Sequence, residues 1–419
     1  MQDELIAVDP ALAQAWRSSG LAPLQLGGRT LLPIVQGGMG VGVSAHRLAG
    51  SVAALGGVGT LSSVDLRRQH PDLMAATRGL DMGDVAQAKA LIQAANQTAL
   101  QREIAAALAL AQGRGLVAVN VMRAVSDYAE SVRTALEAGV HMVVVGAGLP
   151  LDLPELAQDH PQALLVPILS DARGVQLVVK KWARKQRLPD AIVIEHPRLA
   201  GGHLGAAKIA DLADPRFDFE NVLPAVREFL REAGIERHVP LIAAGGVRCF
   251  EDIRRLQALG ADAVQLGTAF AVTQECDADI SFKQVLAGAR DEDLLEFTSV
   301  AGLPARAVGT PWLRKYLQAL PRLQAQVHHK QRCTKAFDCL AQCGLRDGLA
   351  GWGQFCIDHQ LAAALRGETH KGLFFRGVGA LPFGDQIRPV RELMARLLTP
   401  GTALSAPAAR PLPAAAMPA

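Results

Sequence analysis

One histidine set among glycines is the residue of this 419-residue chain best suited to acid–base chemistry. His203 stands in the run Gly201-Gly202-His203-Leu204-Gly205, which follows a short apolar stretch at 191–194. Glycines at this density let the backbone approach a ligand closely, and an imidazole titrates near neutrality, which suits proton transfer. We therefore predict an exposed loop whose His203 is suited to proton transfer. A surface turn that merely contains a histidine is the alternative, because a lone glycine-rich motif has little specificity.

Other polar or glycine-rich residues end apolar runs in the same way. Each run is short and rich in β-branched residues, which predicts a buried strand. The residues at the ends of these strands are Gln36, Gly37, Gly38 and Met39, then Asn120, then Gly245 and Gly246, and finally Gln265, Gly267 and Thr268.

Eight such runs recur along the chain, separated by mostly helical stretches. They are residues 34–36, 58–63, 116–121, 142–146, 163–169, 191–194, 240–244 and 263–266. Repeated strand–helix units indicate a parallel sheet covered by helices, and eight of them over roughly 235 residues match a (β/α)8 TIM barrel. A doubly wound open sheet is the alternative. In a barrel all strands end on one face, so the polar strand ends would meet at a single mouth.

These strand ends have the parts of a site for a phosphorylated, flat, heterocyclic cofactor. Backbone N–H groups after the seventh and eighth barrel strands commonly bind phosphate, which points to Gly245-Gly246 and Gly267-Thr268. The amide of Asn120 suits the edge of a heterocycle, and residues 37–39 offer backbone to a flat ring. FMN fits this description, whereas simple chain turns are the structural alternative. No glycine fingerprint with an acidic partner supports a resident nicotinamide cofactor, so NAD(P)H would serve only as a transient reductant.

Four segments, residues 33–39, 200–205, 243–247 and 261–270, resemble the nitronate monooxygenase (2-nitropropane dioxygenase-like) family. The resemblance spans about residues 31–313 and implies an FMN-binding barrel related to FMN-dependent enoyl-ACP reductases and NADH:quinone reductases. It also implies that His203 is the catalytic base, which removes the α-proton of a nitroalkane or assists substrate binding beside the flavin. Gly201, Gly202, Gly246 and residues 265–268 would hold FMN. Gly38 stands where many relatives have proline, and Leu199 stands where an acidic residue is common, so the substrate is the part of the resemblance left open.

The function implied by this resemblance is oxidation of alkyl nitronates by O2 to carbonyl compounds and nitrite. One alternative is an NAD(P)H-dependent flavin reductase of enoyl thioesters or quinones. A second alternative, of another class, is a non-catalytic flavin-binding sensor or assembly subunit.

Outside the core of the barrel the composition changes. We expect a lead-in at 1–30 with a helix from Pro10, a barrel at 31–273 with an insertion at 65–115, a mostly helical region at 274–400 and a disordered tail at 401–419. Within the helical region, a loop at 374–379 and then a closing helix at 389–394 are expected over the barrel mouth, so that the region 274–400 is a candidate substrate lid. Cys333, Cys339, Cys343 and Cys356 raise an iron–sulfur or zinc site as a hypothesis, but they lack a C-x2-C pair, and buried thiols explain them equally well.

Composition excludes several classes of partner. The formal net charge of +3 gives no reason to expect nucleic acid or an acidic membrane surface. No run of eighteen apolar residues predicts a membrane span, and the acidic N-terminus does not look like a secretory signal. Cysteines confined to the C-terminal half argue for a reducing, cytoplasmic setting. The expected partner is a small-molecule substrate, with a homodimer left open.

Overall fold

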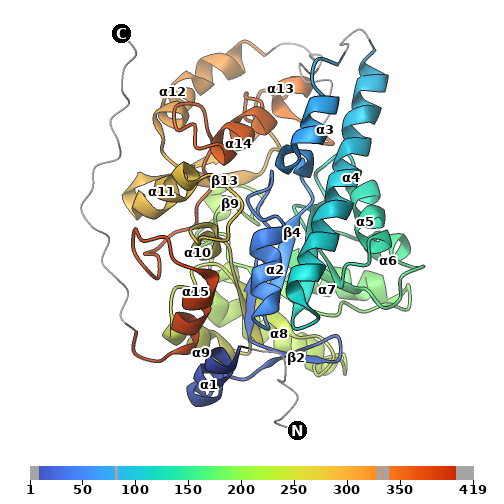
Figure 1. The fold of residues 1–419 in the computed structure, drawn as a ribbon, viewed down its shortest axis with the longest axis vertical. Helices are drawn as coiled ribbons and strands as arrows, with labels where there is room; N and C mark the ends of the chain where they lie inside the picture. The colour runs from blue at the N-terminus through green and yellow to red at the C-terminus, as the bar shows by residue number, and fades with distance from the viewer. Residues whose placement is uncertain (1–8, 81–83, 328–332, 334–338, 403–419) are drawn as a thin grey trace.

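The computed structural model describes residues 9–80, 84–327, 333 and 339–402. Eight parallel strands form a closed barrel in which β11 pairs with β3 and completes the ring. The strands are β3 (Ile34–Gln36), β4 (Val58–Ser62), β5 (Leu116–Met122), β6 (Met142–Gly146), β7 (Leu164–Leu169), β8 (Ile192–Glu195), β10 (Leu241–Ala244) and β11 (Ala263–Leu266). The predicted TIM barrel is confirmed, and the open sheet is wrong (Figure 1).

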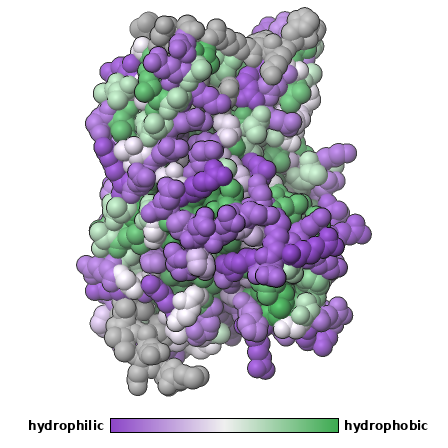
Figure 2. Space-filling view, turned by 90° about the vertical axis from the view of Figure 1, so that its right-hand side faces the viewer, coloured by the Kyte–Doolittle hydropathy of each residue, from purple (hydrophilic) through white to green (hydrophobic). Residues whose placement is uncertain are grey.

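Amphipathic helices surround the barrel. They include α2 (His46–Ala54), α5 (Tyr128–Glu137), α6 (Leu153–Leu156), α7 (Ala172–Ala183), α8 (Phe219–Glu232), α9 (Phe250–Ala258) and α10 (Thr268–Ala271). In α7 the buried residues are Val175, Val178, Val179 and Trp182, the spacing of one helix face. The face of the molecule drawn in Figure 2 is largely hydrophilic, with scattered hydrophobic residues. The helices therefore turn apolar stripes inward onto the strands.

The N-terminal end of the barrel is closed by a segment that we expected to be a polar lead-in. After α1 (Pro10–Ser19), strands β1 (Leu24–Leu26) and β2 (Arg29–Leu31) pair as a hairpin. Leu24, Leu26 and Leu31 are buried in one cluster with inward residues of the barrel strands. The expectation was wrong for this hairpin, because strands of three residues are too short to show an alternating pattern. The predicted tail from residue 403 onward lies outside the described residues.

The start of α2 is held by a side chain from a distant part of the sequence. Ser44, which lies next to the helix, does not cap it and accepts a hydrogen bond from the backbone N–H of Met39, over 2.8 Å. The first turn of α2 is bound by the carboxylate of Asp277, which accepts from the backbone N–H groups of Ala45 and Leu48. A carboxylate 230 or so residues away in the chain replaces the local cap, and no local pattern reveals it.

The predicted insertion contains η1 (Leu66–Gln69), α3 (Pro71–Ala76) and the long helix α4 (Val85–Ala111), which packs against α2. Glu103 of α4 is buried, and its carboxylate lies 2.8 Å from His46 Nδ1 and 3.0 Å from His70 Nε2. The hydrogen bond to Glu103 raises the pKa of His46. Burial alone would raise the pKa of Glu103, but the hydrogen bonds from His46 outweigh it, and the pKa is lowered.

We expect this pair to make stability depend on pH. The contribution of His46 is complete below the ordinary histidine pKa of about 6.5 and is lost as pH rises through the raised value. The contribution of Glu103 is complete above about 4.5 and is lost as pH falls through the lowered value. His46→Gln should therefore lower the melting temperature by about 2 °C near pH 5.5, and by less near pH 9. The control is His238→Gln, which changes an exposed histidine. If His46→Gln lowers the melting temperature relative to this control by the same amount at both pH values, the pairing of His46 with Glu103 is contradicted.

The C-terminal region forms a second layer above the barrel in Figure 1. The layer contains α11 (Ile280–Gly288), β12 (Leu294–Thr298), β13 (Pro304–Val308), α12 (Pro311–Ala325), α13 (Gly344–Asp347) and α14 (Ile357–Leu365). The last helix of the region, α15 (Val390–Leu398), lies lower, beside the barrel. Strands β12 and β13 form an antiparallel sheet with β9 (Gly202–His203), the short strand that carries the predicted catalytic histidine. Among the described residues, no helix combines the length and apolar character needed to cross a membrane.

Helix α15, the closing helix of the prediction, does not lie over the mouth. It packs against α1, α2 and α9 on the outside of the barrel, and its residues Leu393, Met394, Leu397 and Leu398 are buried there. It fills the gap between the helices that follow the first and seventh strands. The short α10 after the eighth strand is too small to cover that gap. The expectation of a lid was wrong for this helix, because an amphipathic pattern does not say which surface it packs on.

Candidate active site

A cavity of about 330 Å³ opens at the carboxyl ends of the barrel strands, between the barrel and the C-terminal layer. Almost all of the predicted site residues line it, although they come from strand ends far apart in sequence. They are Gly37, Gly38, Met39, Asn120, Gly201, Gly202, His203, Gly245, Gly246, Gln265, Gly267 and Thr268. The closed barrel brings them together, as its topology requires.

Gln36 is the exception. Its side chain is fully buried and joins β3 to β4, donating to the carbonyl of Thr60 over 3.0 Å and accepting from the Thr60 N–H over 2.9 Å. The amide is thus used within the barrel wall and not at the cavity, where Gly37 takes its place. The expectation that Gln36 contacts a cofactor is corrected accordingly.

The ends of β10 and β11 present unused backbone donors to the cavity. Within the described part of the chain, no carbonyl or side chain accepts from the N–H groups of Gly246, Gly267 and Thr268. Gly246 has a φ of 73°, a conformation that side chains other than hydrogen disfavour. The hydroxyl of Thr268 accepts from the N–H of Gly377 over 3.0 Å, which leaves its own proton to donate. Such a set of donors fits an anion such as a phosphate group.

The opposite side of the cavity fits a flat ring. A Cβ at Gly38 would lie 2.4 Å from Cβ of Asn120, and a Cβ at Gly37 would lie 3.2 Å from the side chain of Gln265. The amide side chains of Asn120 and Gln265 therefore press directly on the backbone at 37–38, and a side chain there would not fit. This packing leaves a backbone surface with amide groups beside it, which suits a planar heterocycle.

His203 lies on a strand and not on an exposed loop. It pairs with Ala305 of β13, and its Nε2 lies 3.0 Å from Oγ of Ser299. The ring of Phe375 packs on it with centroids 5.5 Å apart. The side chain is half-buried at the cavity wall. The expectation of an exposed loop was wrong because the partner strand comes about a hundred residues later.

This environment keeps the imidazole neutral. Burial lowers the pKa of His203 to about 4, since a cation loses hydration there and no carboxylate pairs with it among the described residues. When Nε2 donates to Ser299, the lone pair is on Nδ1. The side chain can then accept a proton, and it does not supply a fixed positive charge at pH 7.

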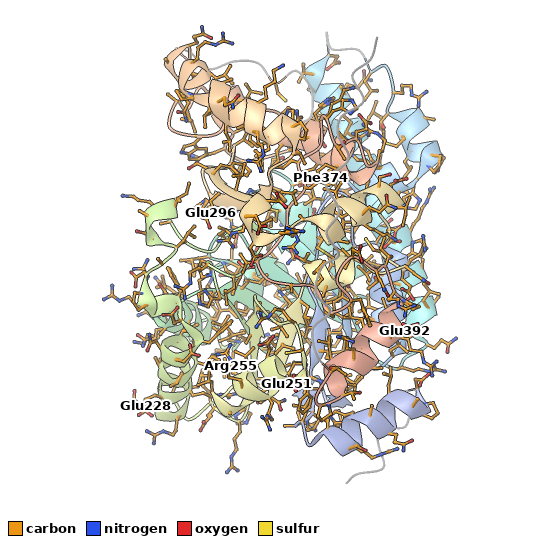
Figure 3. The ribbon with its side chains drawn as sticks, turned by 90° about the vertical axis from the view of Figure 1, so that its left-hand side faces the viewer. Glu228, Glu251, Arg255, Glu296, Phe374 and Glu392 are labelled. Carbon is orange, nitrogen blue, oxygen red and sulfur yellow. The ribbon has the colours of Figure 1, made fainter. Side chains whose placement is uncertain are left out.

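Arg306 of β13 holds the segment that leads to His203. Its guanidinium is buried, donates to the carbonyls of Ala200 and Pro197 and pairs with Glu296, which is labelled in Figure 3. Arg306→Met should lower the free energy of unfolding by about 2–4 kcal/mol, because two carbonyls lose a charged donor. The matched control is Arg255→Met, whose ion pair with Glu220 is exposed and should change stability by less than about 1 kcal/mol. If chemical denaturation shows that Arg306→Met and Arg255→Met lose the same amount of unfolding free energy, this role of Arg306 is contradicted.

Sequence analysis expected the loop at 374–379 over the barrel mouth, and residues 375–379 do line the cavity. It did not identify the other apolar side chains of the upper wall of the cavity, which are Phe282, Leu286, Leu340, Ile357, Leu361 and Leu373. Their patterns indicated only buried segments, and nothing local assigned them to the barrel mouth. Glu195, the last residue of β8, also lines the cavity. It could have been found by the signal that pointed to Asn120, a polar residue ending an apolar strand.

The four cysteines of the metal hypothesis lie near one another. Burial raises the pKa of Cys339 well above its usual range, and Asp358 and the thiols of Cys356, Cys343 and Cys333 add to this rise. Cys339 lines the cavity, while Cys343 and Cys356 directly precede α13 and α14. Across the described residues, no group of three or more His, Cys, Asp or Glu side chains is arranged to hold a metal ion. The hypothesis of a site that also includes Cys333 thus gains no support from this structure and stays a hypothesis.

A family model described as "Nitronate monooxygenase" matches residues 28–400. The chain belongs to the nitronate monooxygenase family. The resemblance inferred from the sequence is thereby confirmed, and with it the expectation of an FMN-dependent oxidoreductase group.

Individual relatives of this family are distant. The chain is 23% identical over 192 residues to the "Probable nitronate monooxygenase" of Staphylococcus saprophyticus, matching 45% of this chain and 50% of that protein. It is 24% identical over 302 residues to a protein of the same description from Bacillus subtilis, matching 68% of this chain and 78% of that protein. The chain thus spans only about half the length of the first relative.

Two solved structures share the fold. FabK from Thermotoga maritima superposes with a TM-score of 0.58 at 20% identity, covering 87% of this chain and 91% of that one. The nitroalkane oxidase of Streptomyces ansochromogenes gives 0.57 at 20% identity, covering 91% and 96%. At this identity the likeness establishes the barrel architecture.

Proposed function

We propose that this protein is an FMN-dependent oxidoreductase that oxidises alkyl nitronates. The observation that carries the proposal is a neutral imidazole, His203, in a cavity ringed by unused backbone donors. Membership of the nitronate monooxygenase family supports the same reading.

The residues at the cavity fit FMN. The N–H groups of Gly246, Gly267 and Thr268 would hold its phosphate, and the backbone at 37–38 with the amides of Asn120 and Gln265 would receive its ring system. When bound, the flavin supplies the redox chemistry, passing electrons from an organic substrate to dioxygen.

The role of His203 is proton transfer. A nitroalkane bound at the cavity presents an acidic α-hydrogen, and the neutral imidazole accepts that proton at the nitrogen not bonded to Ser299. The electron pair of the broken C–H bond moves to the nitro oxygens and gives the nitronate. Phe375 and the apolar upper wall exclude water from this step.

A second function, an NAD(P)H-dependent reductase of enoyl thioesters or quinones, is favoured by the apolar wall. Side chains such as Phe282, Leu286 and Leu361 offer more apolar surface than a short nitronate needs. An elongated acyl chain or a quinone would use it.

Anaerobic mixing separates the two functions. The FMN-loaded protein is mixed with ethylnitronate in one experiment and with NADH or NADPH in another, and flavin absorbance is followed. Bleaching by the nitronate, with nitrite released once air is admitted, supports the proposed function. Rapid bleaching by the nicotinamide alone, reversed by an enoyl thioester or quinone, supports the second function and contradicts the first.

A further inference from the structure

Glu195 is a carboxyl group of the cavity that the proposed function does not use. It ends β8, after three buried residues, and its register partner is Ala244 of β10. A Cβ built on Gly205 would lie 3.6 Å from Glu195 Oε2, so the carboxyl packs beneath the segment that carries His203, two residues earlier. Glu195 and His203 thus line the same cavity from adjoining segments.

The carboxyl group has no charged partner. In the part of the chain that the structure describes, no Arg, Lys or His pairs with Glu195, and no hydrogen bond to its side chain is formed. Glu195 itself is half-buried at the cavity wall. Carboxylates elsewhere in the protein have donors: Asp65 lies against Arg67 and Arg68, and Asp277 accepts from the backbone of α2. A carboxyl group held away from bulk water without a donor favours its protonated form.

The remaining ionisable groups of the cavity do not supply the missing partner of Glu195. Arg248 pairs with Asp252, Asp358 pairs with Arg68, and the buried guanidinium of Arg376 donates to the carbonyl groups of Leu286 and Gly379. Cys339 and His203 complete the set of titratable groups at the lining. Burial raises the pKa of Glu195 to about 7, while that of His203 is lowered to about 4. Between these values the cavity holds a neutral acid and a neutral base.

We propose that Glu195 is the acid of this site, a neutral carboxyl group that donates a hydrogen bond to the oxygen on which negative charge develops. The proposal rests on the proposed function. As His203 takes the α-proton, the electron pair of the C–H bond moves to a nitro oxygen, and the O–H of Glu195 stabilises that oxygen without transferring its proton. The same donor would serve an enolate oxygen formed from a thioester. Oxyanion donors held in a dry site are among the strongest contributions to catalysis.

The test uses the FMN-loaded full chain and compares Glu195→Leu and Glu195→Gln with wild type. Exchange of the α-hydrogen of nitroethane in D2O without oxygen measures proton removal apart from any redox step. We expect the rate for wild type to rise through about pH 4 and to fall through about pH 7. Glu195→Leu, which has no donor, should be roughly a hundredfold slower, with FMN affinity changed less than about threefold. Glu195→Gln should keep most of the wild-type rate, because its amide N–H donates to the same oxygen, and should lose the fall near pH 7. An unchanged rate in Glu195→Leu, a fall near pH 7 that persists in Glu195→Gln, or a loss confined to FMN affinity would overturn the proposal.

A second readout does not depend on the substrate. The infrared C=O band of a protonated carboxyl should be present in wild type below about pH 7, disappear above it, and be missing in Glu195→Gln. If wild type shows this band but exchanges nitroethane no faster than buffer, the acid is present and the proposed function fails. If the band is the same in both proteins, Glu195 is ionised throughout and the proposal fails.

Discussion

Replacing His203 with Asn is expected to lower turnover by roughly a hundredfold or more while FMN remains bound. The size follows from the usual contribution of a positioned base, about 10²–10⁴. The amide of Asn can still meet Ser299 but cannot accept the α-proton of a nitroalkane. Steady-state nitrite release with neutral nitroethane as the substrate, whose α-proton must be removed, and flavin absorbance are measured on the same preparation.

The control for this substitution is His238→Asn, which changes an exposed histidine far from the cavity in sequence and should leave turnover unchanged. A His203→Asn protein with full turnover would remove this residue from the mechanism. A protein that has lost FMN as well as turnover would assign His203 to cofactor binding instead.

Gly201→Ala is expected to have the second large effect. A Cβ at this position would lie 2.3 Å from the carbonyl carbon of Arg376 and from the N–H nitrogen of Gly377. These are backbone atoms, and the buried side chain of Arg376, bonded to the carbonyl of Leu286, holds them in place. The strand that carries His203 must therefore shift. We expect a loss of about 1–3 kcal/mol in unfolding free energy and a fall of about a hundredfold in turnover, since a misplacement near 1 Å has that effect.

Gly40→Ala is the matched control for Gly201→Ala, because Gly40 also lines the cavity and its Cβ would make only an ordinary contact, 3.8 Å from Ser62 Oγ. It should retain most of the turnover and stability of wild type. If Gly201→Ala behaves like Gly40→Ala in thermal unfolding and in nitrite release, the close approach of the two loops is not required for function.

Much of the barrel was predictable because its signals are local. Each strand is a short apolar run, and each glycine-rich end lies next to its strand, so the eightfold repeat also predicted which residues meet. The Gly201–His203 segment and the Gly245-Gly246 and Gly267-Thr268 ends were found this way.

The errors come from long-range packing. His203 becomes a strand only because Ala305 of β13 pairs with it, and α2 is capped by Asp277 from beyond the last barrel strand. Gln36 was assigned to the cavity because it ends a strand, yet its amide is used between β3 and β4. The apolar pattern of α15 did not reveal that it completes the outer ring of helices. Glu195 carried the same signal as Asn120, a polar residue at the end of an apolar strand, but it was not predicted as a site residue.

The most direct test of the account is a crystal structure of the protein with FMN. We predict the phosphate within hydrogen-bond distance of the backbone N–H groups of Gly246, Gly267 and Thr268. The isoalloxazine should lie against the backbone at residues 37–38, with His203 and Glu195 facing the space beside it. A flavin bound elsewhere, or crystals that stay colourless in excess FMN, would contradict the central claim that the barrel mouth is a flavin site.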